Sequence, residues 1–254
     1  MLFLPLLLAM CCGERAAPRY TAASVVHALT GEAVLVPDTF ASIYGEELAF
    51  ATAQLRAADV QGGLLPVQLP GTGVTVSVGG VAVPVWYVSP TQINFLVPSF
   101  VVPRTEVEVW LIVDGRAGPV VRLRVQEAAP ALFPYDRDTA LLMDAAGQVR
   151  TRQNPVEAGS DVILLATGLG GFVKETAFRQ LPTGPAELLR RAEFRILLNG
   201  EPVSDGLIRY AGAAPTLAGV TQINLKLPEG LGAMPPIQLA MGARLSPVLT
   251  LPVR

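Results

Sequence analysis

Apolar and polar residues alternate in short runs along the chain, and glycine or proline bounds most of these runs. Over residues 74–78, valine occupies every second position, and Thr75 and Ser77 lie between the valines. Because successive side chains of a strand point to opposite faces, this alternation predicts a strand with one buried face. The pair Gly79-Gly80 predicts a tight turn into a second strand over residues 81–88. Further strands are expected over residues 41–45, 92–97, 106–111, 120–125, 161–166, 194–198, 207–210, 222–227, 237–241 and 248–253.

Helical periodicity is almost absent from the chain. A helical turn or a long loop is expected within residues 46–61, and a short helix is expected over residues 185–191, with Pro185 in its first turn. Many short strands separated by Gly and Pro turns are typical of antiparallel β-sandwiches. The fold class is therefore expected to be all-β.

One eight-residue pattern occurs twice in the chain. The sequence Thr-Gln-Ile-Asn-Phe-Leu-Val-Pro at 91–98 returns as Thr-Gln-Ile-Asn-Leu-Lys-Leu-Pro at 221–228, so Gln92 and Gln222 are 222 − 92 = 130 positions apart. A solenoid needs roughly three or more repeats to build a shared core, so each of these two copies is expected to close its own core. The expected organisation is a signal peptide over residues 1–19, a first domain over 20–127 and a second domain over 128–254.

The composition narrows the class of protein. Apolar residues make up 51% of the chain and charged residues only 16%, against about 25% charged residues in a typical soluble domain. The formal net charge of −2 gives no basic surface, so nucleic acid is not expected as a partner. The only cysteines are Cys11 and Cys12, so a chain cleaved after them has neither a disulfide nor a thiolate metal site.

The N-terminal residues are typical of an export signal. Residues 2–10 are apolar, and the polar stretch 13–18 has the character of a cleavage region, although no Lys or Arg precedes the apolar run. The run is too short to span a bilayer, which needs about 20 residues. Residues 8–11 also resemble a lipoprotein box, but Met10 stands where a small residue is expected. Export is favoured, and a lipid anchor at Cys11 or a buried N-terminal segment are the alternatives.

The repeated strand carries two amides in each copy: Gln92 and Asn94, then Gln222 and Asn224. Side chains two positions apart share one face of a strand, so each pair is expected to act together. A repeated polar ligand site is one interpretation. A structural role is favoured, because buried amides need hydrogen-bond partners and because the pair is present in both copies. The tyrosines that correspond between the copies belong to the same structural motif: Tyr87 and Tyr210.

The sequence gives only weak signals for catalysis or metal binding. His27 is the only histidine, and no Gly-x-Ser-x-Gly elbow accompanies it. Residues 168–171 read Gly-Leu-Gly-Gly without the Lys-Ser/Thr of a phosphate loop, which favours a turn. Asp136, Asp138 and Asp144 lack the spacing of a calcium loop. We therefore expect no enzymatic activity, no bound metal and no cofactor.

The two tryptophans differ between the copies. Trp86 and Trp110, with Ile112 two positions further on, correspond to polar or small residues in the second copy: Arg209, Gln238 and Ala240. Strand alternation places their neighbours in the core, so the rings are expected on the outer face of the first domain. Trp86, Trp110 and Ile112 are therefore a candidate binding face. The alternative is that the rings pack against the second domain.

Several other motifs accompany the repeated strand. Residues 25–28 read Val-Val-His-Ala, residues 42–45 Ser-Ile-Tyr-Gly, residues 86–90 Trp-Tyr-Val-Ser-Pro and residues 158–162 Ala-Gly-Ser-Asp-Val. Together with the two Gln-Ile-Asn strands, the combination resembles a C-terminal domain family of acidobacterial (Solibacter-type) secreted proteins, over residues 25–254. The resemblance implies two tandem immunoglobulin-like sandwiches of the IPT/TIG type and a location outside the cytoplasm. It implies no catalytic or ligand residues.

The sequence as a whole predicts a secreted or cell-surface protein that serves adhesion or interaction and has no catalytic activity. Its expected partner is a protein or a polysaccharide. The alternative function is that of a carbohydrate-binding accessory module in an extracellular polysaccharide-degrading system. A coplanar pair of exposed aromatic rings over a groove would favour the sugar ligand, and a ring facing the second domain would favour packing.

Overall fold

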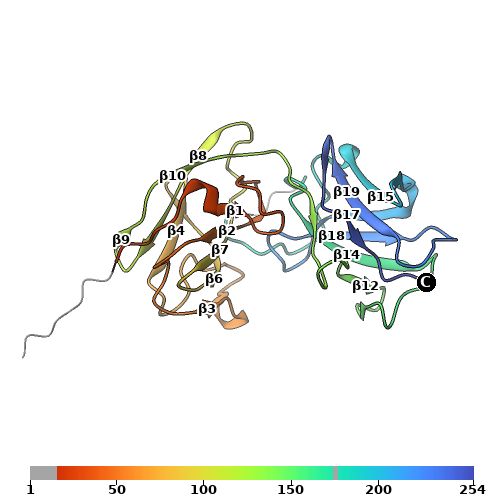
Figure 1. The fold of residues 1–254 in the computed structure, drawn as a ribbon, viewed down its shortest axis with the longest axis horizontal. Helices are drawn as coiled ribbons and strands as arrows, with labels where there is room; N and C mark the ends of the chain where they lie inside the picture. The colour runs from red at the N-terminus through yellow and green to blue at the C-terminus, as the bar shows by residue number, and fades with distance from the viewer. Residues whose placement is uncertain (1–15, 174–176) are drawn as a thin grey trace, which may run out of the picture.

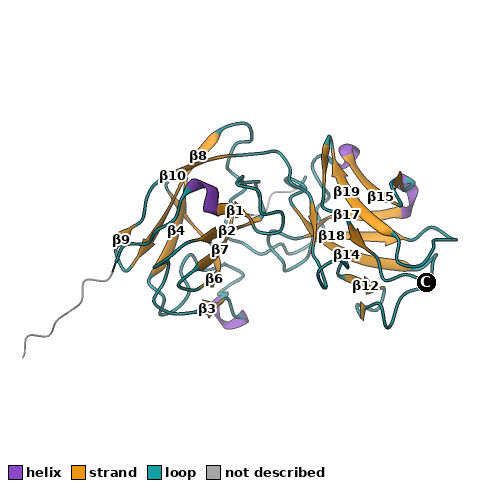
Figure 2. Ribbon diagram, in the orientation of Figure 1, coloured by secondary structure: helices purple, strands orange, loops and turns teal. Residues whose placement is uncertain are grey.

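The computed structural model describes residues 16–173 and 177–254, so most of the expected signal peptide (residues 1–15 of it) lies outside the described residues. Within the described part, nearly all regular elements are strands, and they form four sheets (Figures 1 and 2). The pairings between neighbouring strands are antiparallel, which confirms the expected all-β class of β-sandwiches. No helix in the described ranges has the length and apolar character needed to cross a membrane.

The first half of the chain contributes two sheets that share one core. One sheet has the order β1 (Val25–His27), β2 (Phe40–Tyr44), β7 (Gln92–Leu96), β6 (Val85–Val88), β3 (Ala53–Gln54). The other has the order β10 (Val121–Arg124), β8 (Glu106–Val113), β4 (Val74–Val78), β5 (Val81–Val83), and β9 (Arg116–Ala117) pairs with β8. Their facing side chains form a single cluster that includes Ile43, Val76, Phe95 and Leu111, all fully buried.

The second half repeats this arrangement around a separate core. One sheet has the order β13 (Val149–Arg150), β12 (Leu142–Asp144), β14 (Asp161–Thr167), β18 (Thr221–Lys226), β17 (Ile208–Ala213), and β11 (Ala131–Leu132) pairs with β14. The other has the order β16 (Glu201–Pro202), β15 (Phe194–Leu198), β19 (Pro236–Met241), β20 (Arg244–Leu245), and β21 (Leu249–Thr250) pairs with β19. Leu164, Phe194, Ile223 and Leu239 are fully buried members of its core.

The strand expected over residues 81–88 is divided at Pro84 into β5 and β6, which belong to different sheets. Proline has no N–H group for a sheet ladder, so it suits a position where the chain leaves one sheet and joins another. The Pro84 carbonyl still accepts a hydrogen bond of 2.9 Å from the Leu96 N–H. The single long strand was therefore a wrong prediction, and the turn at Gly79-Gly80 was correct.

The short helix expected over residues 185–191 is also wrong. The segment lies beside the edge strand β17, where Glu187 pairs with Gly212 and Leu188 bridges to Phe172. The Leu188 N–H donates to the Ala211 carbonyl at 3.0 Å, so the backbone is paired across to the sheet rather than within a helix. The helical elements of the described residues are short 3-10 turns: η1 (Ala22–Ser24), η2 (Ala57–Asp59), η3 (Arg191–Glu193) and η4 (Asp205–Leu207).

The two halves lie side by side along the long axis of the molecule (Figure 1) and are joined by apolar contacts. We call these contacts the junction cluster: Leu65, Leu96 and Ala218, with Phe40, Leu55, Val60, Trp86 and Leu181 packed against them. Gly219 belongs to the same contact, because a Cβ atom there would lie 2.8 Å from Cδ1 of Leu96. The absence of a side chain at Gly219 allows this close approach.

Backbone hydrogen bonds also connect the two halves. The Leu65 N–H donates to the Arg179 carbonyl at 2.8 Å, and the Leu181 N–H donates to the Gly63 carbonyl at 2.9 Å. The Nε atom of Arg179 donates back to the Leu65 carbonyl at 2.8 Å. These directional bonds, added to the junction cluster, favour one relative placement of the two halves.

Candidate functional site

Trp86 lies in the junction cluster. It sits in β6 at a β-bulge between Val85 and Tyr87, is half-buried, and meets the Phe40 ring edge-to-face at 4.9 Å between centroids. The bulge occurs in both copies, since β17 has the same irregularity between Ile208 and Tyr210. The ring therefore packs where the second half of the chain contributes Ala218 and Leu181.

Trp110 and Ile112 lie on the other sheet of the first sandwich, in β8. Both are half-buried, and the alternating residues Val109, Leu111 and Val113 are buried in the core. Trp110 and Ile112 therefore share the outer face of their sheet, next to each other. The structure does not bring them together with Trp86, which lies on the sheet across the core.

The Gln-x-Asn pairs make the same contact in both copies. The Gln92 Nε2 atom donates to Asn94 Oδ1 at 2.8 Å, and the Gln222 Nε2 atom donates to Asn224 Oδ1 at 2.8 Å. In the first copy, Ser42 also donates its hydroxyl to Asn94 Oδ1 at 2.9 Å. One amide hydrogen bond thus joins each pair along its strand, β7 or β18.

The tyrosines of this motif occupy matching positions, since Tyr87 pairs with Asn94 and Tyr210 with Asn224. The Tyr210 hydroxyl donates to the Ala213 carbonyl at 2.9 Å and accepts from the Ala186 N–H at 3.2 Å. Burial raises the pKa of Tyr210 above its usual value. These contacts give Tyr210 a role in tying the 185–188 segment to the edge strand.

His27 is buried, with 1% of its surface exposed. Its Nδ1 atom accepts a hydrogen bond from the Thr30 N–H at 3.2 Å, and its Nε2 atom has no hydrogen-bond partner among the described residues. Burial lowers the pKa of His27 to about 4. The described residues contain no group of three or more His, Cys, Asp and Glu side chains placed to hold a metal ion.

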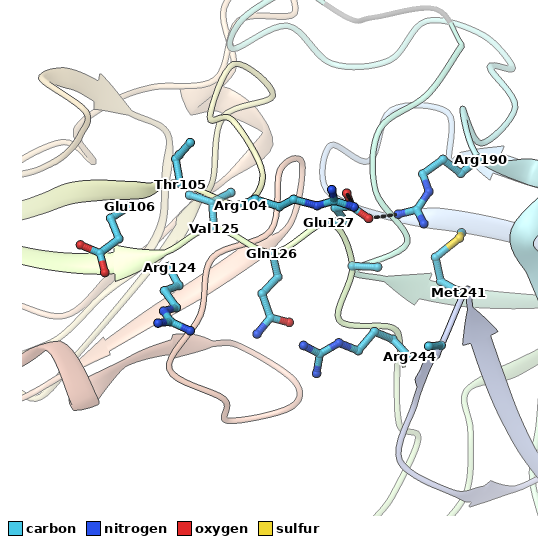
Figure 3. Close-up of a pocket in the computed structure, with 12 residues that line it drawn as sticks. Arg104, Thr105, Glu106, Arg124, Val125, Gln126, Glu127, Arg190, Met241 and Arg244 are labelled. Carbon is cyan, nitrogen blue, oxygen red and sulfur yellow. Dashed lines mark ion pairs between the residues drawn. The ribbon is translucent and has the colours of Figure 1, made fainter.

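A cleft of about 650 Å³ opens between the two halves, and sequence reasoning did not find it. We call it the cationic cleft; it is lined by Arg104, Thr105, Glu106, Arg124, Val125, Gln126, Glu127, Ala128, Arg190, Met241, Ala243 and Arg244. Most of these residues come from the end of the first sandwich and the connection to the second. The turn between β19 and β20 and the residue before η3 complete the lining (Figure 3).

Four arginines and two glutamates line the cationic cleft, a local charge of 4 − 2 = +2. The whole chain has the opposite sign, with a formal net charge of −2. Glu127 pairs with Arg104 at 2.8 Å and with Arg190 at 3.1 Å, so its carboxylate holds two of the guanidinium groups in place (Figure 3). A hydrogen bond with Glu193 raises the pKa of Arg190 above its usual value.

Arg124 and Arg244 are the other two cations of the cleft. Both are exposed, and neither has an ion-pair partner among residues 16–173 and 177–254. Between them along the cleft lies Gln126, whose buried Oε1 atom accepts no hydrogen bond from the described residues. In Figure 3 the polar ends of Arg124, Gln126 and Arg244 extend into the same space. The cleft therefore presents two cations without ion pairs beside the side chain of Gln126, whose Oε1 atom is buried and unpaired.

Comparison with models of protein families returns no match, and comparison with curated protein sequences returns none either. Among solved structures, 94 chains match. A surface glycan-binding protein of the Bacteroides ovatus mixed-linkage glucan utilization locus, in complex with a mixed-linkage heptasaccharide, has a TM-score of 0.34 and 13% identity, covering 87% of this chain and 44% of that chain.

Two further structures illustrate the range of matches. A surface glycan-binding protein of Prevotella bryantii has a TM-score of 0.27 and 10% identity, covering 91% of this chain and 42% of that chain. An adhesin of Yersinia pseudotuberculosis, InvE, has a TM-score of 0.24 and 14% identity, covering 94% of this chain and 61% of that chain. The chain thus spans less than half the length of either glycan-binding protein.

Proposed function

We propose that this chain is a non-catalytic binding protein of the cell surface or the extracellular space, and that its ligand occupies the cationic cleft. The observation that carries the proposal is the cleft itself, in which Arg124 and Arg244 lack ion-pair partners among the described residues. Concave sites with a few convergent polar groups are where proteins usually bind ligands.

The contacts between the two halves support this proposal. A site built from two domains works best when the domains are held in one arrangement, since less conformational freedom is then lost on binding. The junction cluster and the backbone bonds from Leu65 and Leu181 provide such contacts. The cleft is thereby prepared for its ligand before the ligand arrives.

The organisation of the chain belongs to the same proposal. Residues 1–19 are an export signal, residues 20–127 and 128–254 are the two domains, and the chain is a member of the acidobacterial family of IPT/TIG-like sandwiches that its motifs resemble. The location outside the cytoplasm follows from the export signal.

A second candidate function is carbohydrate binding by the outer face of β8. The observation that favours it is Trp110 beside Ile112, both half-buried on the outer face of their sheet. Indole rings provide much of the contact energy in many binding sites. This candidate predicts that Trp110→Gln removes binding and that changes in the cationic cleft leave it intact.

The test is a binding array of glycans and extracellular proteins, probed with the purified chain and two matched double variants. Arg124→Ala with Arg244→Ala removes the two unpaired cations of the cleft. Arg137→Ala with Arg209→Ala removes two exposed cations elsewhere and gives the same change of net charge. Binding that only the cleft variant loses supports the proposal, and binding that both double variants retain but Trp110→Gln loses supports the second candidate. The absence of any ligand on the array contradicts both.

A further inference from the structure

We propose that the ligand of the cationic cleft is a carboxylated polysaccharide, a chain of sugars that carries uronic acid groups. The inference rests on the proposed function of the cleft and names the chemistry of what it binds.

The charge of the cleft selects an anion. Arg124 and Arg244 project from different halves of the chain into one space (Figure 3), and neither forms an ion pair among the described residues, although Glu106 lies opposite Arg124 on the neighbouring strand. The guanidinium group offers several N–H donors in a planar fork that matches a carboxylate in two parallel hydrogen bonds. Two such groups on opposite walls suit a ligand that carries carboxylates at intervals.

Gln126 adds a requirement for a hydrogen-bond donor. Arginine only donates, so a bare carboxylate would satisfy the two cations and leave the Gln126 Oε1 atom without a partner. Because this oxygen is buried, it reaches a ligand only after the half-buried amide turns about its last side-chain bond and brings the oxygen toward the cleft. A sugar hydroxyl beside a carboxylate would supply the donor that this oxygen lacks. Uronic acids carry both groups on the same ring.

The rest of the lining argues against other ligands. None of the described residues that line the cleft is aromatic, whereas neutral sugars and single-stranded nucleic acids are usually held by stacking on aromatic rings. An acidic protein segment would normally place apolar anchors in a dry pocket, and the exposed arginines leave the cleft wet. The volume of about 650 Å³ suits a short stretch of a linear glycan.

Glu127 sets how much of the positive charge is available. It occupies Arg104 and Arg190 at the same time, so only half of the cations in the cleft are free. Replacing its carboxylate by the neutral amide in Glu127→Gln releases Arg104, whereas Arg190 keeps its ion pair with Glu193. This variant is expected to bind a carboxylated glycan several-fold more tightly than the original chain does.

The experiment is isothermal titration of the purified chain with oligogalacturonate and with the same oligosaccharide after methyl esterification. Oligogalacturonate is expected to bind, with affinity that falls as NaCl is raised from about 50 to 200 mM because charges are screened. Esterification, or Arg124→Ala with Arg244→Ala, is expected to weaken binding at least tenfold. The Arg137→Ala and Arg209→Ala control is expected to bind as the original chain does.

Three further ligands test whether the cleft binds another class of anion. Equal binding of a sulfated glycan without carboxylates, of polyglutamate, or of a single-stranded oligonucleotide would overturn the carboxylated-sugar assignment, as would equal binding of the esterified oligosaccharide. If a neutral glycan or a protein from the array binds instead and the cleft variant loses it, the proposed function stands and this inference falls. If no ligand of any class depends on the cleft, both fall.

Discussion

The two tryptophans should respond differently to replacement by the residues of the other copy, Trp86→Arg and Trp110→Gln. Trp86 packs in the junction cluster against Phe40, and Trp110 lies on the outer face of β8. We therefore expect Trp86→Arg to weaken the contact between the two halves, and Trp110→Gln to leave this contact unchanged.

The magnitude follows from the burial of the rings. Truncating a fully buried Trp costs about 3–5 kcal/mol, and Trp86 is only half-buried, so about 2 kcal/mol is expected for the packing. The edge-to-face pair with Phe40 adds roughly 0.5–1.5 kcal/mol beyond the buried area. A total near 3 kcal/mol for Trp86→Arg compares with about 2 kcal/mol for Trp110→Gln, because Trp110 is half-buried as well but has no aromatic ring partner among the described residues.

The assay is urea denaturation followed by circular dichroism and by tryptophan fluorescence. The chain has only two tryptophans, so the Trp110→Gln variant leaves Trp86 as its single indole and its fluorescence reports on the junction. In the Trp86→Arg variant, the two halves are expected to unfold in two separate transitions. This placement of the rings would be refuted by a stability loss below about 0.5 kcal/mol for Trp86→Arg, or by a loss for Trp110→Gln that exceeds the loss for Trp86→Arg.

Three other outcomes are expected. N-terminal sequencing of the protein from its native host should begin after Met10, and an intact Met1 in cytosolic protein would contradict export. A fragment of residues 128–254 should unfold cooperatively, because its core cluster is separate from that of residues 20–125, and a disordered far-UV spectrum would show that the halves depend on each other. Burial lowers the pKa of His27 to about 4, so the unfolded chain, with a histidine pKa near 6.5, binds the proton first. Stability should therefore be complete above about pH 6.5 and fall by about 2 kcal/mol by pH 4.5, and His27→Gln should reduce this pH dependence of the urea midpoint.

Strands with a clear period of two were predictable from the sequence. β4 and β7 were expected within a residue or two of their observed bounds. In β4 valines alternate with polar residues, and in β7 Ile93 and Phe95 alternate with amides, so only one face of each strand can be buried. The two-residue strands β3, β13 and β16 are too short to show any period. The 185–191 segment was misassigned because its backbone partners lie in β17, far away in the sequence.

The cationic cleft was not predictable in the same way. Arg104, Arg124, Arg190 and Arg244 come from four separate segments of the chain, and only the placement of the two halves brings them to one space. The pattern of charges along the chain carries no signal of this proximity. The sequence left open whether Trp86 would pack against the second half; the ring lies in the junction cluster, to which both halves contribute.

The comparison of the two copies explains where the chain can hold a unique site. A tandem of two similar sandwiches has one junction, so a residue that faces it in the first copy has a counterpart that faces something else in the second. Trp86 is half-buried in the junction cluster, whereas its counterpart Arg209 is exposed. The Gln-x-Asn contact has no relation to the junction and is the same in both copies. Residues that serve the fold of each sandwich therefore repeat, and a site that depends on both sandwiches must be sought among the residues that differ. The arginines of the cationic cleft lie at the junction between the copies, which is the part of the chain that the repeat does not duplicate.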